Sequence, residues 1–206
     1  VKLIEAARLL NGIFLEQLWA GNTDLEKKLK ADTTPLGKAR YQYFLLNKGP
    51  WSEIDEHKAF IAGVPDKKLP GAGFYPPDMT KAEFEAWAKT LPAADKAKAE
   101  GFFSVIRRGP DKKLLSVPFG VVWEKQLVQA ANLLREAAKL TENASLKKFL
   151  ELRAAAFLND DYYASDVAWM DLDAPLDITI GPYETYNDEI FGYKAGYEAY
   201  VNIRDD

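Results

Sequence analysis

The chain has 206 residues, of which 48% are hydrophobic and 28% charged, so it has the composition of a globular protein able to bury a substantial core. Its formal net charge of -4 argues against a nucleic-acid-binding protein, because such proteins normally carry a basic excess. The sequence contains no Cys and a single His, His57, which excludes disulfides, thiol chemistry and a zinc site made of several imidazoles.

Helices are predicted for most of the first 47 residues. A helix over residues 1–20 is expected because apolar residues recur along it at helical spacing. Thr23 is expected to cap a short charged helix that runs to about Lys30, and Pro35 to open a helix that ends near Asn47. The apolar stripe of the first helix comprises Leu3, Ala7, Leu10, Phe14 and Leu18.

An irregular segment is predicted over residues 48–79, where Pro and Gly are frequent. His57 lies within it, in the charged run WSEIDEHKAF, and is expected to be an exposed or structural residue. Thr80 then precedes KAEFEAWAKTL, with Glu83 three residues later, which is the pattern of a capping box at a helix start.

A β-hairpin is predicted near residues 102–117, because two β-prone runs flank Gly-Pro-Asp-Lys. A long amphipathic helix is expected over 121–141, followed by a helix over 144–158 that Asn143 caps. The segment DDYYASDVAWMDL is expected to form one further short helix. The buried stripe of the long helix comprises Leu127, Ala131, Leu134 and Ala138.

The end of the chain is rich in Ile, Tyr, Thr and Val. The segments DITIGPYETY and FGYKAGYEAYVNI both alternate in polarity, as half-buried strands do, and NDEI between them is expected to form the turn. The predicted class is therefore mainly α with a small antiparallel β element (α+β). A helical part would cover 1–170 and a β part 171–206, with its strands near 177–203.

Alternation along these strands places Glu184 and Tyr186 on the same face as Ile178, and Glu198 is expected near them across the hairpin. The predicted polar face of the second strand comprises Gly192, Lys194, Gly196, Glu198, Tyr200 and Asn202. Carboxylates beside phenol rings suit a cationic group such as the free amino terminus of a peptide. The same pattern is also typical of a half-buried sheet whose polar face is simply solvated.

The segment AWMDLDAPLDITIGPYETYNDEIFGYKAGYEAYV contains a Trp, then Gly-x-x-Glu-[Ser/Thr]-Tyr, an acidic turn and a Glu in an aromatic strand. The residues of this pattern are Trp169, Gly181, Glu184, Thr185, Tyr186, Asp188 and Glu198. On this pattern the chain resembles the dipeptidyl peptidase III family of zinc metallopeptidases, specifically its compact bacterial members. The motifs NKGPW and FYPPDMT extend the resemblance upstream, over most of the chain.

The resemblance implies a two-lobed peptidase with the substrate cleft between its lobes. One lobe holds zinc through a HEXXGH-type helix and a later Glu, and the other holds the peptide. On this interpretation residues 1–206 form a single domain, the lobe without zinc, and the β part lines the cleft. The implied substrate-binding residues are Glu184, Tyr186, Glu198 and Trp169.

The sequence departs from the family pattern at the metal site. It contains no HEXXGH motif, so the resemblance implies no catalytic or metal-binding residue and no cofactor in this chain. The expectation is a fragment, inactive alone, whose partners are a peptide substrate and a missing C-terminal lobe with the zinc. No apolar run approaches the roughly 18 residues that a membrane-spanning helix needs. The composition does not distinguish an exported or periplasmic protein from a cytoplasmic one.

Two other functions remain open on the sequence alone. Long amphipathic helices are common in non-catalytic binding or scaffold proteins. Some relatives of the peptidase family are called Nudix hydrolases, but the Nudix signature, a Gly followed by a spaced Arg-Glu-x-x-Glu-Glu helix, is absent from the sequence.

Overall fold

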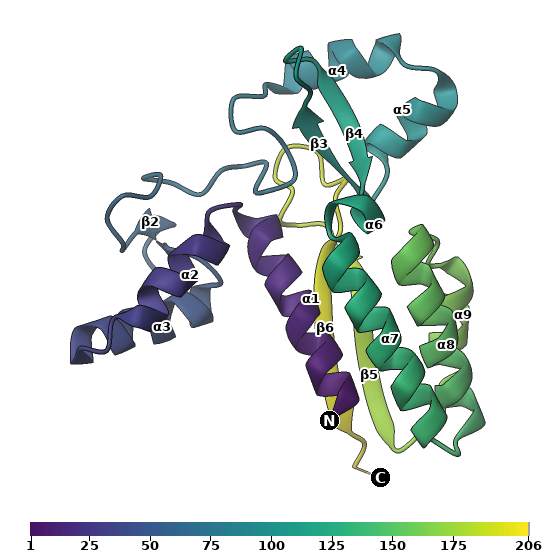
Figure 1. Cartoon of the computed structure of the whole chain (residues 1–206). Coiled ribbons are helices and arrows are strands. Elements are labelled where there is room, and N and C mark those ends of the chain that lie inside the picture. The colour runs from purple at the N-terminus through teal and green to yellow at the C-terminus, as the bar shows by residue number, and fades with distance from the viewer. Residues whose placement is uncertain (206) are drawn as a thin grey trace.

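The computed structural model describes residues 1–205 and has a helical body, a long β-hairpin and two smaller helix–hairpin units (Figure 1). The helices are α1 (Lys2–Leu18), α2 (Asn22–Ala31), α3 (Pro35–Asn47), α4 (Lys81–Thr90), α5 (Ala93–Glu100), α6 (Phe119–Val122), α7 (Glu124–Leu140), α8 (Ala144–Asn159) and α9 (Tyr163–Met170). The strands are β1 (Trp51–Ser52), β2 (Lys58–Ala59), β3 (Ser104–Arg108), β4 (Leu114–Pro118), β5 (Leu176–Glu184) and β6 (Gly196–Ile203). The α+β class predicted from the sequence is confirmed.

The main core lies where α1 packs against α7 on one side and against β6 on the other. The predicted stripe of α7 is correct, because all four of its residues are buried. The stripe of α1 is partly wrong, since Ala6 and Ile13 are buried where Ala7 and Phe14 were expected. Helix α1 contacts two elements in different directions, so its buried surface is wider than one line of apolar residues.

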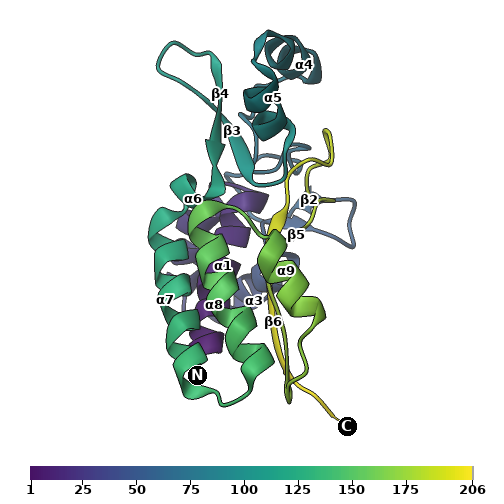
Figure 2. The same ribbon diagram turned by 90° about the vertical axis from the view of Figure 1, so that its right-hand side faces the viewer.

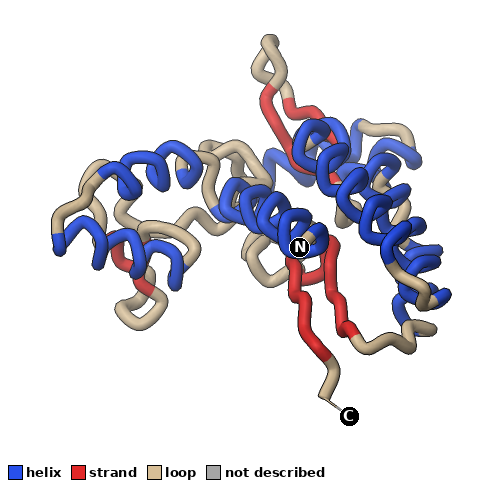
Figure 3. Tube along the Cα trace, turned by 60° about the horizontal axis from the view of Figure 1, so that its bottom comes forward, coloured by secondary structure: helices blue, strands red, loops and turns tan. Residues whose placement is uncertain are grey.

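The strands β5 and β6 form an antiparallel hairpin whose register runs from Leu176 opposite Ile203 to Glu184 opposite Gly196. Figure 2 shows α7 and α8 next to each other, with α9 beside the hairpin. Figure 3 shows the N-terminal end of α1 next to the two strands, and α1 contacts β6. The inner face of the hairpin buries Ile178, Ile180 and Tyr197 completely.

The predicted start of the second strand is wrong. β6 begins at Gly196, and residues 185–195 form a long connection in place of the short NDEI turn. The reason is the buried carboxylate of Asp188, which accepts hydrogen bonds from the backbone N–H groups of four following residues and from the Tyr75 hydroxyl. Those N–H groups are therefore not free to form a strand ladder. The four residues are Ile190, Phe191, Tyr193 and Lys194.

Most of the predicted helix starts are confirmed by their capping bonds. The side chains of Thr34, Thr80 and Asn143 each accept a hydrogen bond from a backbone N–H in the first turn of α3, α4 and α8. The predicted cap at Thr23 is wrong, because the N-cap of α2 is Gly21, two residues earlier, and the Thr23 hydroxyl donates to Glu16 instead.

The hairpin near 102–117 is confirmed as β3 and β4, which pair from Ser104 opposite Pro118 to Arg108 opposite Leu114. The segment 48–79 is irregular as predicted, apart from the two-residue strands β1 and β2. Within residues 1–205, no helix combines the length and the apolar character needed to cross a bilayer.

Candidate functional site

A β-bulge at Tyr183 determines which way the end of β5 faces. Pro182 lies opposite Tyr197, and Glu184 lies opposite Gly196, so Tyr183 is an extra residue on the β5 side. Residues directly opposite each other in an antiparallel pair project from the same face of the sheet. The bulge therefore moves Glu184 away from the buried face that carries Tyr197.

Glu184 consequently shares the outer face of the hairpin with Glu198. Strict alternation placed Glu184 with Ile178 on the buried face, and that prediction is wrong by one residue because of the bulge. Glu184 and Glu198 nevertheless lie close together, as expected, because the charge of Glu184 raises the pKa of Glu198.

The electrostatic effects identify four side chains that act on one another. Partial burial raises the pKa of Glu198, and the charge of Glu184 raises it further. The charge of Glu198 is the main reason that the pKa of Tyr200 is raised, with smaller contributions from burial, Tyr186 and Glu184. We refer to Glu184, Tyr186, Glu198 and Tyr200 as the outer-face cluster.

The outer-face cluster is open to a ligand, because the rings of Tyr186 and Tyr200 are 66% and 57% exposed. The two carboxylates carry like charges, and their repulsion raises the pKa of one of them. A cation bound between them would relieve this repulsion. Tyr200 was placed on the polar face by alternation but was not singled out among the candidate residues. Tyr200 follows Glu198 by two residues on the same strand, and this spacing indicates that the two side chains share a face.

Trp169, the fourth predicted site residue, lies on α9 rather than on the hairpin. Its indole N–H donates to the backbone carbonyl of Ile178 at 2.9 Å, so it holds α9 against the middle of β5. The ring remains 42% exposed. The structure therefore gives Trp169 a contact with β5 that the sequence did not predict, and its proximity to the peptide stays a prediction.

A buried arginine lies directly behind the bulge. Arg153 on α8 has no exposed surface, donates to Asp166, and has its guanidinium 5.2 Å from the ring centre of Tyr162 and 5.5 Å from that of Tyr183. A Cβ atom on Gly181 would lie 2.3 Å from its Nη1 atom, so only glycine fits there. Sequence reasoning missed Arg153, because nothing in its helical context distinguishes it from a surface residue.

The connection 185–195 is anchored by a buried lysine. The ammonium group of Lys194 donates to the carbonyl of Ala99 at 2.6 Å, to that of Gly101 at 2.9 Å and to the Ser104 hydroxyl at 2.9 Å. Burial lowers the pKa of Lys194 to about 7. The prediction that Lys194 faces solvent from a strand is therefore wrong, because the end of α5 supplies carbonyl acceptors that its ammonium can reach.

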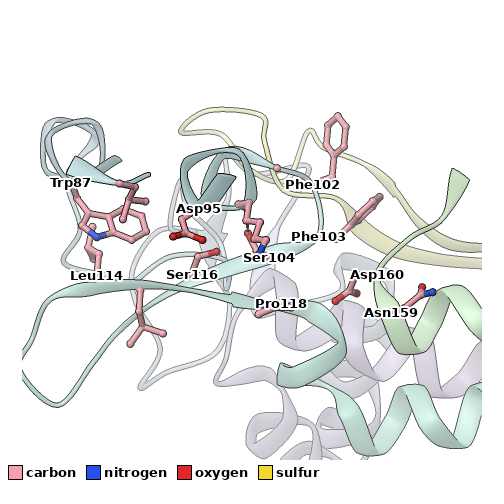
Figure 4. Close-up of a pocket in the computed structure, with 14 residues that line it drawn as sticks. Trp87, Asp95, Phe102, Phe103, Ser104, Leu114, Ser116, Pro118, Asn159 and Asp160 are labelled. Atoms are coloured by element: carbon pink, nitrogen blue, oxygen red, sulfur yellow. Dashed lines mark hydrogen bonds between the residues drawn. The ribbon is translucent and has the colours of Figure 1, made fainter. Parts of the chain in front are cut away.

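A cavity of about 710 Å³ lies between α4, α5 and the β3–β4 hairpin. Figure 4 shows Trp87 and Leu114 at one end of it and Phe103 and Asp160 at the other. Two of its polar side chains are already used within the fold, since Ser104 bonds to Lys98 and Lys194, and Asp160 accepts from the N–H of Gly120. This cavity is therefore mainly an apolar surface.

The residues of the chain do not fit a zinc site. Among residues 1–205, no three His, Cys, Asp or Glu side chains gather closely enough to hold a metal ion. The one imidazole, His57, is 44% exposed and has its Nδ1 atom 3.5 Å from the carboxylate of Glu53. The charged run around His57 thus forms a surface pair, and no step of catalysis can be built on a metal held by these residues.

Two solved structures closely match the fold. The dipeptidyl-peptidase III of Corallococcus sp. strain EGB is 56% identical with a TM-score of 0.94, and that of Caldithrix abyssi is 45% identical with a TM-score of 0.93. Each match covers 99% of this chain and 38% of the solved chain.

Sequence comparison gives a plant relative with a different name. Nudix hydrolase 3 of Arabidopsis thaliana is 41% identical over 99% of this chain, which spans 33% of that protein. No family model matches the chain. The identities to these two solved peptidases, together with nearly complete agreement of the fold, decide the assignment: this is a dipeptidyl-peptidase III-like chain, and it spans 38% of each of the two solved chains.

Proposed function

We propose that this chain is the peptide-holding lobe of a zinc-dependent peptidase of the dipeptidyl-peptidase III type, and that it forms a single domain. Its β part, residues 171–206, would line the substrate cleft, with Glu184, Tyr186 and Glu198 around the amino terminus of the peptide and Trp169 beside them. The zinc and the residues that activate water would belong to a lobe outside this chain, so the chain alone would not hydrolyse peptides.

One observation carries the proposal. Glu184 and Glu198 share the outer face of the hairpin, and the charge of Glu184 raises the pKa of Glu198. A protonated amino terminus between them would relieve this repulsion and donate charge-assisted hydrogen bonds to the two carboxylates. The exposed rings of Tyr186 and Tyr200 would cover the first residue of the peptide.

The test uses the full-length protein that contains this chain, with peptides that have free or acetylated amino termini. We expect acetylation to weaken binding to the wild type, and Glu184→Gln to remove most of that difference. Because the interaction exists in the ground state, the change should appear mainly in KM and less in kcat. Gln129→Ala on the exposed surface of α7 serves as the control.

Equal binding of free and acetylated peptides by the wild type would contradict the proposal. An unchanged kcat/KM in Glu184→Gln would remove Glu184 from the assigned role.

A further inference from the structure

A second cavity, of about 410 Å³, adjoins the outer-face cluster and shares Tyr186 with it. Its walls come from the end of α1, from the turn that follows α3, from the segment around His57 and from the connection 185–195. The volume lies in the range of pockets that hold small ligands or single side chains. The apolar part of its wall comprises Phe14, Leu18, Leu46 and Trp51.

The connection 185–195 contributes a buried amide to this cavity. Asn187 is 3% exposed, lines the cavity, and has no hydrogen-bond partner for its Nδ2 atom among residues 1–205. Asn47, which lines the same cavity, is by contrast fully used: its Nδ2 atom donates to the Tyr43 carbonyl and its Oδ1 atom accepts from the Glu53 N–H. A buried donor without a partner is unfavourable, so Asn187 has a hydrogen bond to offer to an incoming group.

The neighbouring residues hold the backbone of Asn187 in a fixed position. Asp188 binds four backbone N–H groups and the Tyr75 hydroxyl, and the backbone N–H of Glu189 donates to the Pro70 carbonyl at 2.8 Å. The backbone that carries Asn187 is therefore already ordered before a ligand binds, which lowers the entropic cost of binding.

The charges at the rim decide which kind of group enters. Lys68 lies 3.8 Å from Glu189, and the His57 imidazole lies 3.5 Å from Glu53 on the same segment, so each carboxylate at the rim has a basic neighbour. Lys48 lines the cavity as well and adds a positive charge. A group with an oxygen acceptor fits the Asn187 donor, whereas an ammonium does not.

From these features we infer that the cavity binds a side chain of the peptide held by the outer-face cluster, one with an apolar stem and a terminal oxygen acceptor that receives a hydrogen bond from Asn187. The inference rests on the proposed function and adds a preference for glutamine-like or glutamate-like side chains. The amide and the carboxylate share the oxygen that Asn187 recognises, and the charge of Lys48 would favour the carboxylate.

The experiment uses the full-length protein and tetra-alanine peptides in which one position at a time is replaced by Gln, Glu or Leu. The wild type should bind the Gln or Glu peptide more tightly than the Leu peptide at one position, by about fivefold or more. Asn187→Leu should bring this ratio to about one or below it. Asn187→Asp, which presents an acceptor in place of the donor, should reverse the preference against Glu.

Asn11→Leu, at an exposed position of α1, should leave the ratio unchanged. Thermal melting of each variant shows whether it is folded, and Asn187→Ala, which also removes the donor, replaces any variant that is not. An equal preference in the wild type and every folded Asn187 variant overturns the inference, as does a cavity filled by water alone in a structure with the Gln peptide. Wild-type protein that binds no tetra-alanine peptide at all would instead contradict the proposed function.

Discussion

At the scale of single residues, the features that matter most are charged or polar groups buried by the tertiary fold. Lys194 and Asp188 have 0% and 2% exposure, yet both are fully supplied with hydrogen-bond partners. Together they hold the connection 185–195 against α5 and β3. The backbone that carries Tyr186 and Asn187 is therefore positioned by contacts with segments far from it in the chain.

Lys194 makes stability depend on pH in a defined direction. Because its pKa is lowered to about 7 in the folded chain, the folded state loses this proton while the unfolded state, with the ordinary lysine pKa of 10.5, still binds it. The free energy of unfolding should therefore rise between pH 7 and the ordinary lysine value, by up to about 1.4 kcal/mol per pH unit.

Urea unfolding at several pH values measures this effect. The stability difference between wild type and Lys194→Met should grow as the pH rises from 7 to 9, within the window between the pKa of about 7 and 10.5. Lys125→Met at an exposed position of α7 is the matched control. A constant difference between wild type and Lys194→Met would show that Lys194 stays protonated in the folded chain.

At the scale of elements, the backbone at the end of α1 is in close contact with the backbone of the loop before α4. The N–H of Gly73 donates to the carbonyl of Gln17 at 2.6 Å, and a Cβ atom on Gly73 would lie 2.2 Å from the carbonyl oxygen of Glu16. This backbone-to-backbone contact fixes the loop that supplies Phe74 and Tyr75 to the core.

Gly73→Ala should therefore lower the free energy of unfolding, by about 1–3 kcal/mol, because backbone atoms must move apart. Gly12→Ala in the exposed middle of α1 should have the opposite sign, a gain of about 0.5–1 kcal/mol, since nothing lies within 4 Å of the added methyl. Thermal or denaturant unfolding distinguishes the two. Equal effects of the two substitutions would contradict the tight contact at Gly73.

At the scale of the whole molecule, one buried side chain connects the first helix to the last strand. Gln17 has no exposed surface; its amide donates to the Ala195 carbonyl at 3.2 Å and accepts from the Tyr197 N–H at 2.7 Å. These bonds join the end of α1 to the start of β6, although the two elements are far apart in the chain.

Gln17→Ala should destabilise the fold by about 2–4 kcal/mol, because it removes both bonds and leaves a cavity. Gln129→Ala, at an exposed position of α7, should change stability by less than about 0.5 kcal/mol. Denaturant unfolding of both variants measures the difference. A small effect of Gln17→Ala would mean that pairing with β5 and packing against α1 hold β6 without these two bonds.

The sequence was sufficient to name residues of the candidate site, but it was not sufficient to predict how they are arranged. The spacing of Glu184, Tyr186 and Glu198 predicted a carboxylate–phenol group on the hairpin, and the structure brings these residues together. The alternation that led to the prediction put Glu184 on the wrong face. The bulge lies over Arg153, which is on α8, and no local pattern in the sequence reveals this arrangement.

The sequence by itself determined the features that depend on neighbours a few residues apart: the helix caps at Thr80 and Asn143, the stripe of α7 and the β3–β4 hairpin. Capping bonds and helical periodicity act within one or two turns, so they can be read locally. Only the tertiary structure decided the burial of Lys194 and the placement of Asn187 in a cavity. Both depend on groups brought close by folding, and the free energy of burying a polar atom is set by those distant partners.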